Sequence, residues 1–154
     1  TVTTGCGQGT IFGDILTDLD AVKLNNDSKL HQHTLVEIVD QIRQHRSIYK
    51  QAGSVHGCAL FRGTEMLMFV EDVGRHNAVD AIAGKMWLEG MRGDDLVFYT
   101  TGRLTSEMVI KGAQMGIPFL LSRSGVTQMG VVMARRVGLT LFGRCPGEHF
   151  LLYC

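Results

Sequence analysis

The sequence contains no apolar stretch that approaches the roughly 20 residues of a membrane-spanning helix. It carries no surplus of either charge, because lysine plus arginine and aspartate plus glutamate number 15 each. It also lacks a Walker loop, a G-x-G-x-x-G fingerprint, internal repeats and low-complexity segments. These absences argue against a membrane protein and against a protein whose overall charge attracts nucleic acid. Any anion site must therefore be local.

A leader segment is absent as well. The chain begins at Thr1 with TVTTGCGQGT, without an initiator methionine or the charged and apolar parts of a signal peptide. This start indicates a cut into a longer protein. The four cysteines could form two disulfides in a secreted domain, but eight methionines and the missing leader favour reduced thiols and a cytoplasmic location.

The cysteines do not have the spacing of a zinc site. No C-x-x-C pair occurs, whereas zinc needs about four ligands, or three with a water molecule. His56 and Cys58 in VHGC have no second ligand pair, and the glutamate of the H-x-E motif of zinc deaminases is missing. We expect no zinc. Cys58 is typical of a core residue, and His56 fits either a ligand contact or a turn.

The hydrophobic fraction of 45% in 154 residues predicts one globular domain. A T-x-x-E capping box at Thr34 and Glu37 predicts a helix that continues to about residue 49. Two strands then flank a turn at 62–64. Helices at about 77–88, 105–114 and 127–137 alternate with the strands LVFYTT and FLLS, with Asn77 as the expected cap of the first helix and Asp80 in its first turn. LTLFG and HFLLYC close the chain as a strand pair.

This alternation predicts an α/β fold, a three-layer α/β/α sandwich with a mostly parallel, mixed sheet and right-handed crossovers. We expect residues 1–33 to form a mobile, cysteine-bearing N-terminal segment. Residues 34–154 would form the α/β/α domain that binds the ligand.

Three junctions between a strand and a helix combine arginine with glycine, hydroxyl or amide groups. They span residues 74–77, 100–107 and 122–127. In a parallel sheet such junctions share the edge at which ligands bind, and helix N-termini with arginine recognise anions. We therefore predict an anionic, phosphate-bearing ligand. The alternative is a set of helix caps and solvated charges, with Arg75 in an ion pair with Glu71 or Asp72.

Cys6 lies between Gly5, Gly7 and Gly9, so bulky neighbours do not shield its thiol. This setting suits a cysteine that must be reached by a partner. No lysine, arginine or histidine lies within five residues to lower its pKa, so activation would have to come from elsewhere in the fold. A cysteine without function in a terminal segment is the equally weighted alternative.

The stretches EDVGRHNAVD (71–80), TTGRLTSEMVIKGAQMGIPFLLSRSGVT (100–127) and VGLTLFGR (137–144) resemble the FdhD-type formate dehydrogenase accessory sulfurtransferases. The resemblance covers nearly the whole chain, without the family's N-terminal portion. It implies a cytidine-deaminase-like fold without zinc ligands. It also implies transfer of persulfide sulfur from a cysteine desulfurase to the molybdenum cofactor of formate dehydrogenase, in its bis-molybdopterin guanine dinucleotide form.

The resemblance assigns roles to particular residues. Cys6 matches the persulfide carrier of the family motif T-G-C-G-x-C-G, but the second cysteine of that motif falls at Gly9. The family's F-x-R-G-x-R stretch aligns loosely with RCPGEH, and T-G-G-x-H aligns with residues 52–56. The expected cofactor-binding residues, for which GDP serves as a mimic, are Asp72, Gly74, Arg75, His76, Asn77, Thr101, Gly102, Arg103, Ser122, Arg123, Ser124, Arg144, Cys145, Pro146, Gly147, Glu148 and His149.

We therefore expect a sulfurtransferase that works with a cysteine desulfurase and a formate dehydrogenase, forms a homodimer, and binds neither nucleic acid nor membrane. Because Gly9 replaces a cysteine, a chaperone that binds the cofactor without transferring sulfur is the first alternative. A deaminase-like hydrolase is a second alternative, for which the zinc ligands are absent.

Overall fold

A computed structural model describes residues 21–22, 24, 27–147 and 149–154. The helices are α2 (Gln32–Gln44), α3 (Ile48–Ala52), α4 (Arg75–Leu88), α5 (Ser106–Gln114) and α6 (Gln128–Val137). The strands are β1 (His56–Arg62), β2 (Glu65–Asp72), β3 (Leu96–Thr100), β4 (Phe119–Ser122), β5 (Thr140–Gly143) and β6 (Leu151–Leu152). The predicted hairpin of β1 and β2 and the terminal pair of β5 and β6 are confirmed.

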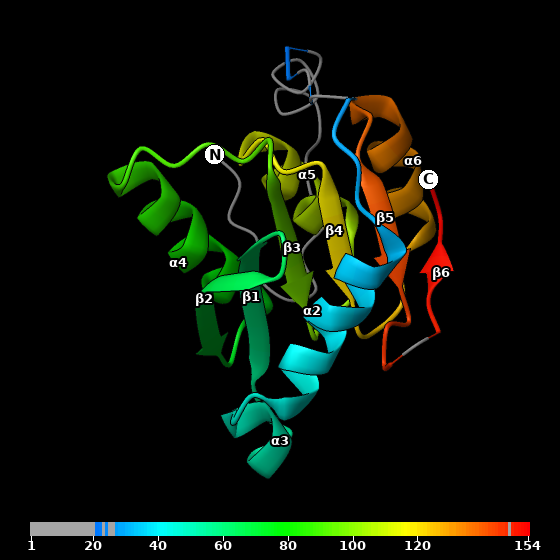
Figure 1. The fold of residues 1–154 in the computed structure, drawn as a ribbon. Coiled ribbons are helices and arrows are strands. Elements are labelled where there is room, and N and C mark those ends of the chain that lie inside the picture. Colours follow the sequence, from blue (N-terminus) through cyan, green and yellow to red (C-terminus); the bar gives the residue numbers. More distant parts are fainter. Residues whose placement is uncertain (1–20, 23, 25–26, 148) are drawn as a thin grey trace.

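The strands form one mixed sheet in the order β2-β1-β3-β4-β5-β6. The pairs β3–β4 and β4–β5 are parallel, whereas β1 is antiparallel to both β2 and β3, and β6 is antiparallel to β5. The predicted mixed α/β sheet is confirmed. Because β1 reverses direction between its neighbours, β2, β3, β4 and β5 all run the same way, as their arrowheads show in Figure 1.

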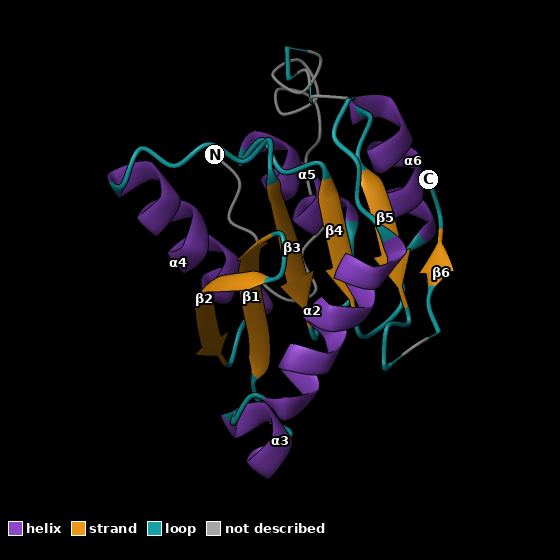
Figure 2. Cartoon of the chain, viewed as in Figure 1, coloured by secondary structure: helices purple, strands orange, loops and turns teal. Residues whose placement is uncertain are grey.

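Helices cover both faces of the sheet, as Figures 1 and 2 show. On one face, α2 contributes Leu35, Ile38, Val39 and Ile42 to a buried cluster with side chains of β1, β3, β4 and β5. On the other face, α4, α5 and α6 pack against the sheet through a larger buried cluster. The alternating strand residues supply both clusters, since successive side chains of a strand point to opposite faces.

The predicted starts of α5 and α6 lie within one residue of the observed ones. Thr127 precedes α6, and its hydroxyl accepts a hydrogen bond from the Gly130 N–H at 3.1 Å. Gly138 ends this helix in the left-handed conformation, with a φ of 73°. Both ends follow the capping chemistry that the sequence predicts.

The predicted capping box at Thr34 and Glu37 is wrong. α2 begins at Gln32, and His31 precedes it without a side-chain capping bond. The helix also ends at Gln44 instead of continuing, so the short helix α3 is a separate element.

α3 has its own start because two groups cap it. The Ser47 hydroxyl accepts a hydrogen bond from the Lys50 N–H at 3.3 Å. The Glu71 carboxylate accepts from the backbone N–H groups of Ile48 and Tyr49, at 2.8 Å each. Since Glu71 lies at the end of β2, the break between α2 and α3 depends on a contact that is distant in sequence.

The described part of the N-terminal segment packs on the rest of the chain. Leu24 is buried in the larger cluster, and Leu30 packs against the smaller one. None of the described helices is long and apolar enough to cross a membrane.

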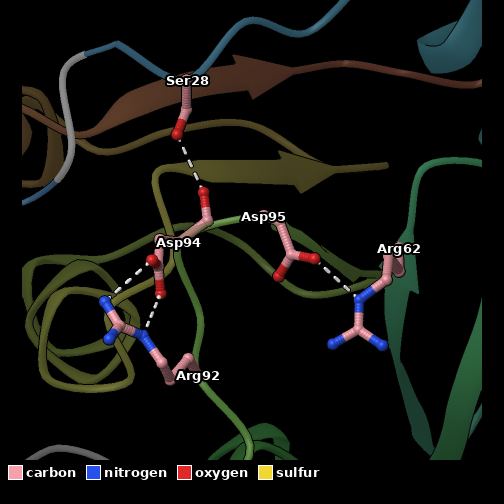
Figure 3. Close-up of polar contacts among 5 residues, drawn as sticks. All are labelled: Ser28, Arg62, Arg92, Asp94 and Asp95. Carbon is pink, nitrogen blue, oxygen red and sulfur yellow. Dashed lines mark hydrogen bonds and ion pairs between the residues drawn. The ribbon is translucent and has the colours of Figure 1, made fainter.

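We call the sheet end at which β3 and β4 begin the amino edge. Figure 3 shows that Arg62 and Arg92 are each paired with an aspartate at this edge. Arg92 forms a two-pronged ion pair with Asp94, at 2.9 and 3.1 Å, and Arg62 Nε lies 2.7 Å from an Asp95 oxygen. The Ser28 hydroxyl donates to the Asp94 carbonyl at 2.8 Å and so holds the N-terminal segment at this edge.

Candidate functional site

The carboxyl edge is the opposite end of the sheet, where β2, β3, β4 and β5 finish and β1 begins. The three predicted junctions all emerge here, because their preceding strands run in the same direction. The prediction that they share one edge is confirmed. His56 pairs with Asp72 in the β1–β2 ladder and therefore also lies at this edge. α3 lies beyond the start of β1 at the same end of the molecule (Figure 1).

Asp72 organises the first junction. One of its carboxylate oxygens accepts from the Gly74 N–H at 2.8 Å and from the Asn77 side-chain amide at 3.0 Å. Gly74 is the residue that precedes α4, and no side chain caps this helix end. The prediction that Asn77 caps α4 is wrong, because Asn77 lies within the first turn and bonds to Asp72 instead. Asp80 consequently falls in the second turn.

Arg75 is the first residue of α4 and forms no ion pair with any described carboxylate. Its Nε is buried and has no hydrogen-bond partner within the described part of the chain. The side chain packs against Gly102, where a Cβ would meet Arg75 Cδ at 3.0 Å and His56 Nδ1 at 3.4 Å. The expected alternative, an ion pair with Glu71 or Asp72, does not form, because both carboxylates bind backbone N–H groups.

The predicted residues Thr101 and Ser122 are buried and support the junctions from within. Gly57 and Thr101 exchange two hydrogen bonds, from Gly57 N–H to the Thr101 hydroxyl at 3.0 Å and from Thr101 N–H to the Gly57 carbonyl at 2.9 Å. The Ser122 hydroxyl donates to the Gly102 carbonyl at 2.7 Å. These hydroxyls fix the loops in position, and their bonding capacity is used inside the protein.

The other three predicted arginines also lie at the carboxyl edge and are exposed. Arg103, Arg123 and Arg144 form no ion pair with a described carboxylate. The Arg123 guanidinium lies over the Tyr49 ring of α3, 5.6 Å from its centre. Arg144 has a positive φ of 52°, and its N–H donates to the Ser124 carbonyl. The edge thus presents cations that the described carboxylates do not neutralise.

Two of the three helices that start at this edge have no side-chain cap. Gly74 precedes α4, and Thr105 precedes α5 without making a capping bond. The Thr105 hydroxyl is buried and has no partner among the described groups. Uncapped helix N-termini carry free N–H groups and partial positive charge, which favour an anion.

His76 and Glu107 meet between the first turns of α4 and α5, with His76 Nε2 3.1 Å from a Glu107 oxygen. Burial lowers the pKa of His76 below its ordinary value of 6.5, and the charges of Arg75 and Lys111 lower it further, against the opposing effect of Glu107 and Asp80. Burial, with a contribution from Arg75, also lowers the pKa of His56. Both imidazoles are therefore neutral near pH 7, and the Nδ1 atom of each is buried without a partner in the part of the chain that the structure describes.

With this geometry established, comparison with known proteins gives a family. The model of the FdhD/NarQ family matches residues 1–154. The chain belongs to the FdhD/NarQ family.

Two relatives named "Sulfur carrier protein FdhD" show how far this similarity extends. The one from Listeria innocua is 30% identical over 154 residues, which are 99% of this chain and 59% of the relative. The one from Saccharolobus solfataricus is 34% identical over 132 residues, which are 84% of this chain and 51% of the relative. The chain therefore spans between about half and three fifths of the length of these relatives.

A solved structure of a formate dehydrogenase accessory protein from Desulfotalea psychrophila has a similar fold, with a TM-score of 0.70 and 40% sequence identity. The match covers 77% of this chain and 52% of the other. An independent FdhD-like structure thus supports the mixed α/β architecture described above.

Cys6, the predicted sulfur carrier of this FdhD/NarQ member, lies outside the described residues. The three described cysteines are free thiols. Burial raises the pKa values of Cys58 and Cys145 to about 11, and burial also raises the pKa of Cys154. Since the thiolate is the reactive form, these three cysteines are poor nucleophiles near neutral pH.

The residues of the C-terminal stretch predicted to bind the cofactor differ in their exposure to solvent. Arg144, Pro146 and His149 are exposed, and Gly147 is partly buried. Cys145 is only 1% exposed and belongs to the core cluster under α2, so its side chain has no access to a ligand. Glu148 lies outside the described residues.

Tyr49, Thr105 and Glu107 at the carboxyl edge are not among the expected cofactor-binding residues, and for His56 the sequence allows either a ligand contact or a turn. The structure places His56 at this edge because β1 runs antiparallel to its neighbours, and Tyr49 because α3 folds over this end. Thr105 and Glu107 lie at the start of α5, within the predicted junction 100–107. This position was the sequence signal that could have identified them as site residues. No group of three histidine, cysteine or acidic side chains suited to a metal ion occurs among the described residues.

Proposed function

We propose that this chain is a sulfur carrier in molybdoenzyme maturation, with Cys6 as the sulfur-bearing residue and the carboxyl edge as the binding site for a guanine nucleotide. The observation that carries the binding part is Arg75. It begins a helix without a side-chain cap, and within the described residues its buried Nε has no hydrogen-bond partner and its guanidinium forms no ion pair with a carboxylate. A buried donor without a partner costs free energy, so this group suits a bound acceptor.

Phosphate is the acceptor that fits the edge best. Arginine binds phosphate through paired N–H donors, and uncapped helix N-termini supply further N–H groups. The first turn of α4, which Arg75 begins, meets the first turn of α5 at His76 and Glu107. Further cations follow the ends of β3, β4 and β5 along the same edge, namely Arg103, Arg123 and Arg144. Such a row of cations suits a pyrophosphate, which carries more than one negative charge.

The bound molecule would be the bis-molybdopterin guanine dinucleotide form of the molybdenum cofactor, as the family resemblance implies. It contains two pyrophosphates and two guanosines, and GDP would mimic one such end. The names of the relatives, sulfur carrier protein and formate dehydrogenase accessory protein, support the role in sulfur delivery to a formate dehydrogenase.

Cys6 would receive sulfur from a cysteine desulfurase as a persulfide. A nucleophile of the acceptor would then attack the outer sulfur and form the new bond with its own electron pair. The S–S bond would break, and Cys6 would leave with that bond's electron pair as a thiolate. Cys58, Cys145 and Cys154 are unsuited to this step, because burial keeps them protonated. The partner enzymes would be a cysteine desulfurase and a formate dehydrogenase, with the carrier acting as a cytoplasmic homodimer.

Mass spectrometry after incubation with a cysteine desulfurase and cysteine tests the sulfur chemistry. We expect one added sulfur atom on Cys6, and none on the Cys6→Ser variant. Added sulfur on Cys58, Cys145 or Cys154 in the folded protein would contradict the assignment. Thermal unfolding of Cys6→Ser controls for loss of structure.

A cofactor-binding chaperone is the second candidate, because Gly9 stands where the family motif has its second cysteine. The two candidates make different predictions for one pair of measurements. The chaperone binds GDP but accepts no sulfur at Cys6, whereas the sulfur carrier does both.

A further inference from the structure

Two ionic contacts join α4 to α5 in successive turns. His76 meets Glu107 at 3.1 Å, and one turn further along both helices Asp80 meets Lys111 at 2.6 Å. The first pair is the more buried, with both side chains 21% exposed, whereas Asp80 is 58% exposed. The first pair also adjoins Arg75 at the carboxyl edge.

The Glu107 contact favours one of the two ring nitrogens of His76 as the site of the proton. Nε2 is the nitrogen that lies 3.1 Å from the Glu107 carboxylate, and a carboxylate can only accept a hydrogen bond, so the contact favours the Nε2–H tautomer. Burial, which has the largest effect, and the charges of Arg75 and Lys111 lower the pKa of His76 and keep the imidazole neutral near pH 7, against the opposing charges of Glu107 and Asp80. In a neutral imidazole with Nε2–H, the Nδ1 atom is a hydrogen-bond acceptor.

Among the described residues, no donor reaches this acceptor. His76 Nδ1 is buried and has no partner within the described part of the chain. A phosphate cannot satisfy it, because phosphate oxygens are themselves acceptors near neutral pH. A guanosine can, because its base carries N–H donors and its ribose carries hydroxyl donors.

We propose that Glu107 is a positioning residue that holds His76 in the Nε2–H tautomer, so that His76 Nδ1 accepts a hydrogen bond from the nucleoside part of the ligand. This inference rests on the proposed nucleotide site and divides it into two parts. Arg75 and the helix N-termini bind the phosphates, and the His76–Glu107 pair binds the nucleoside.

Nitrogen-15 NMR of the imidazole rings in the full chain tests the tautomer without any ligand, with His76→Gln used to assign the signal. We expect a proton on Nε2 and a bare Nδ1, and a shift towards the other tautomer in Glu107→Ala. Asp80→Asn is the matched control, because it breaks the neighbouring contact between the same helices, and it should leave the tautomer unchanged. A proton on Nδ1 in the unaltered chain would overturn the proposal, and so would a tautomer that Glu107→Ala leaves unchanged.

Calorimetric titration with GDP and with inorganic pyrophosphate tests whether His76 Nδ1 binds the nucleoside part of the ligand. The amide of His76→Gln can still donate to Glu107 but offers no group in place of Nδ1. We expect its GDP affinity to fall between about twofold and tenfold, the range for one neutral hydrogen bond, with pyrophosphate affinity unchanged. An unchanged GDP affinity, or an equal loss for both ligands, in a variant that melts like the unaltered chain overturns the proposal.

The failure of the nucleotide site itself would look different. In that case the unaltered chain binds neither GDP nor pyrophosphate, which refutes the binding part of the proposed function and the role of Nδ1 with it. Glu107→Gln, which keeps the length of the side chain, repeats the NMR test if Glu107→Ala does not fold.

Discussion

Both ends of the sheet carry arginines and acidic residues, but among the described residues the arginines are paired with carboxylates at only one of them. At the amino edge, Arg62 and Arg92 are each paired with an aspartate (Figure 3). At the carboxyl edge, Arg75 forms no ion pair with a described residue, although Glu71 and Asp72 are its near neighbours in sequence. The carboxylates there bind backbone N–H groups instead.

This difference separates a structural edge from the edge that we propose as the binding site. Paired surface charges contribute only about 0–1 kcal/mol each and leave little capacity for a ligand. A cleft of about 430 Å³ does open at the amino edge, but the two aspartates that line it, Asp94 and Asp95, already hold arginines. At the carboxyl edge, Arg75 Nε and the Nδ1 atoms of His56 and His76 are buried without a hydrogen-bond partner among the described residues, which is the arrangement that a ligand completes.

Replacing one glycine at each edge with alanine tests the comparison. We expect the larger effect, a loss of folding stability, at the amino edge. A Cβ on Gly93 would meet the Met115 carbonyl oxygen and lie 2.8 Å from the Gly116 carbonyl carbon, both of them backbone atoms. Gly93→Ala should lower the free energy of unfolding by at least about 1–3 kcal/mol. Urea unfolding measures this, with Gly84→Ala as the control. Gly84 has open space around its Cβ position and lies within α4, so its replacement should stabilise by roughly 0.5–1 kcal/mol. Equal stability of the two variants would contradict the close backbone contact.

Gly102→Ala should act on binding rather than on folding. Its Cβ would press on Arg75 and His56, whose side chains can move. We expect GDP affinity to fall by about 1 kcal/mol, or roughly fivefold, with a smaller change in unfolding free energy. Gly84→Ala is the matched control, since its Cβ meets no atom within 4 Å and Gly84 lies within α4, away from the proposed site. If Gly102→Ala binds GDP as tightly as Gly84→Ala does, Arg75 is not held in place by this glycine.

The histidines of the carboxyl edge predict a smaller effect, on the pH dependence of stability. The folded pKa values of His56 and His76 lie below 6.5, so the unfolded chain binds more protons as the pH falls. Their contribution to stability is present above pH 6.5 and is lost as the pH falls through 6.5 towards the folded pKa values. Thermal unfolding between pH 7.5 and pH 5 should therefore show a shallower pH dependence in a His56→Gln/His76→Gln variant. An identical slope would contradict the downward shifts.

Much of the fold could be predicted because its signals are local. The alternation of strands and helices, the stop at Gly138 and the cap at Thr127 depend on neighbouring residues. The shared edge of the three junctions followed from strand direction alone.

The parts that could not be predicted depend on contacts that are distant in sequence. Glu71 caps α3 and so breaks the helix that the sequence pattern continues. Asp72 binds Asn77 and thereby removes it from the capping role. The pairing of His76 with Glu107 requires α4 and α5 to pack side by side, which no single segment reveals.

The most direct test of the account compares one arginine from each edge. Calorimetric titration with GDP should show that Arg75→Ala weakens binding by about 1.5–3 kcal/mol, the range for a charge-assisted hydrogen bond, with little change in thermal stability. Arg92→Ala at the amino edge should leave GDP binding unchanged. If Arg75→Ala binds GDP like the unaltered chain but melts at a lower temperature, Arg75 is a structural residue and the carboxyl edge is not the nucleotide site.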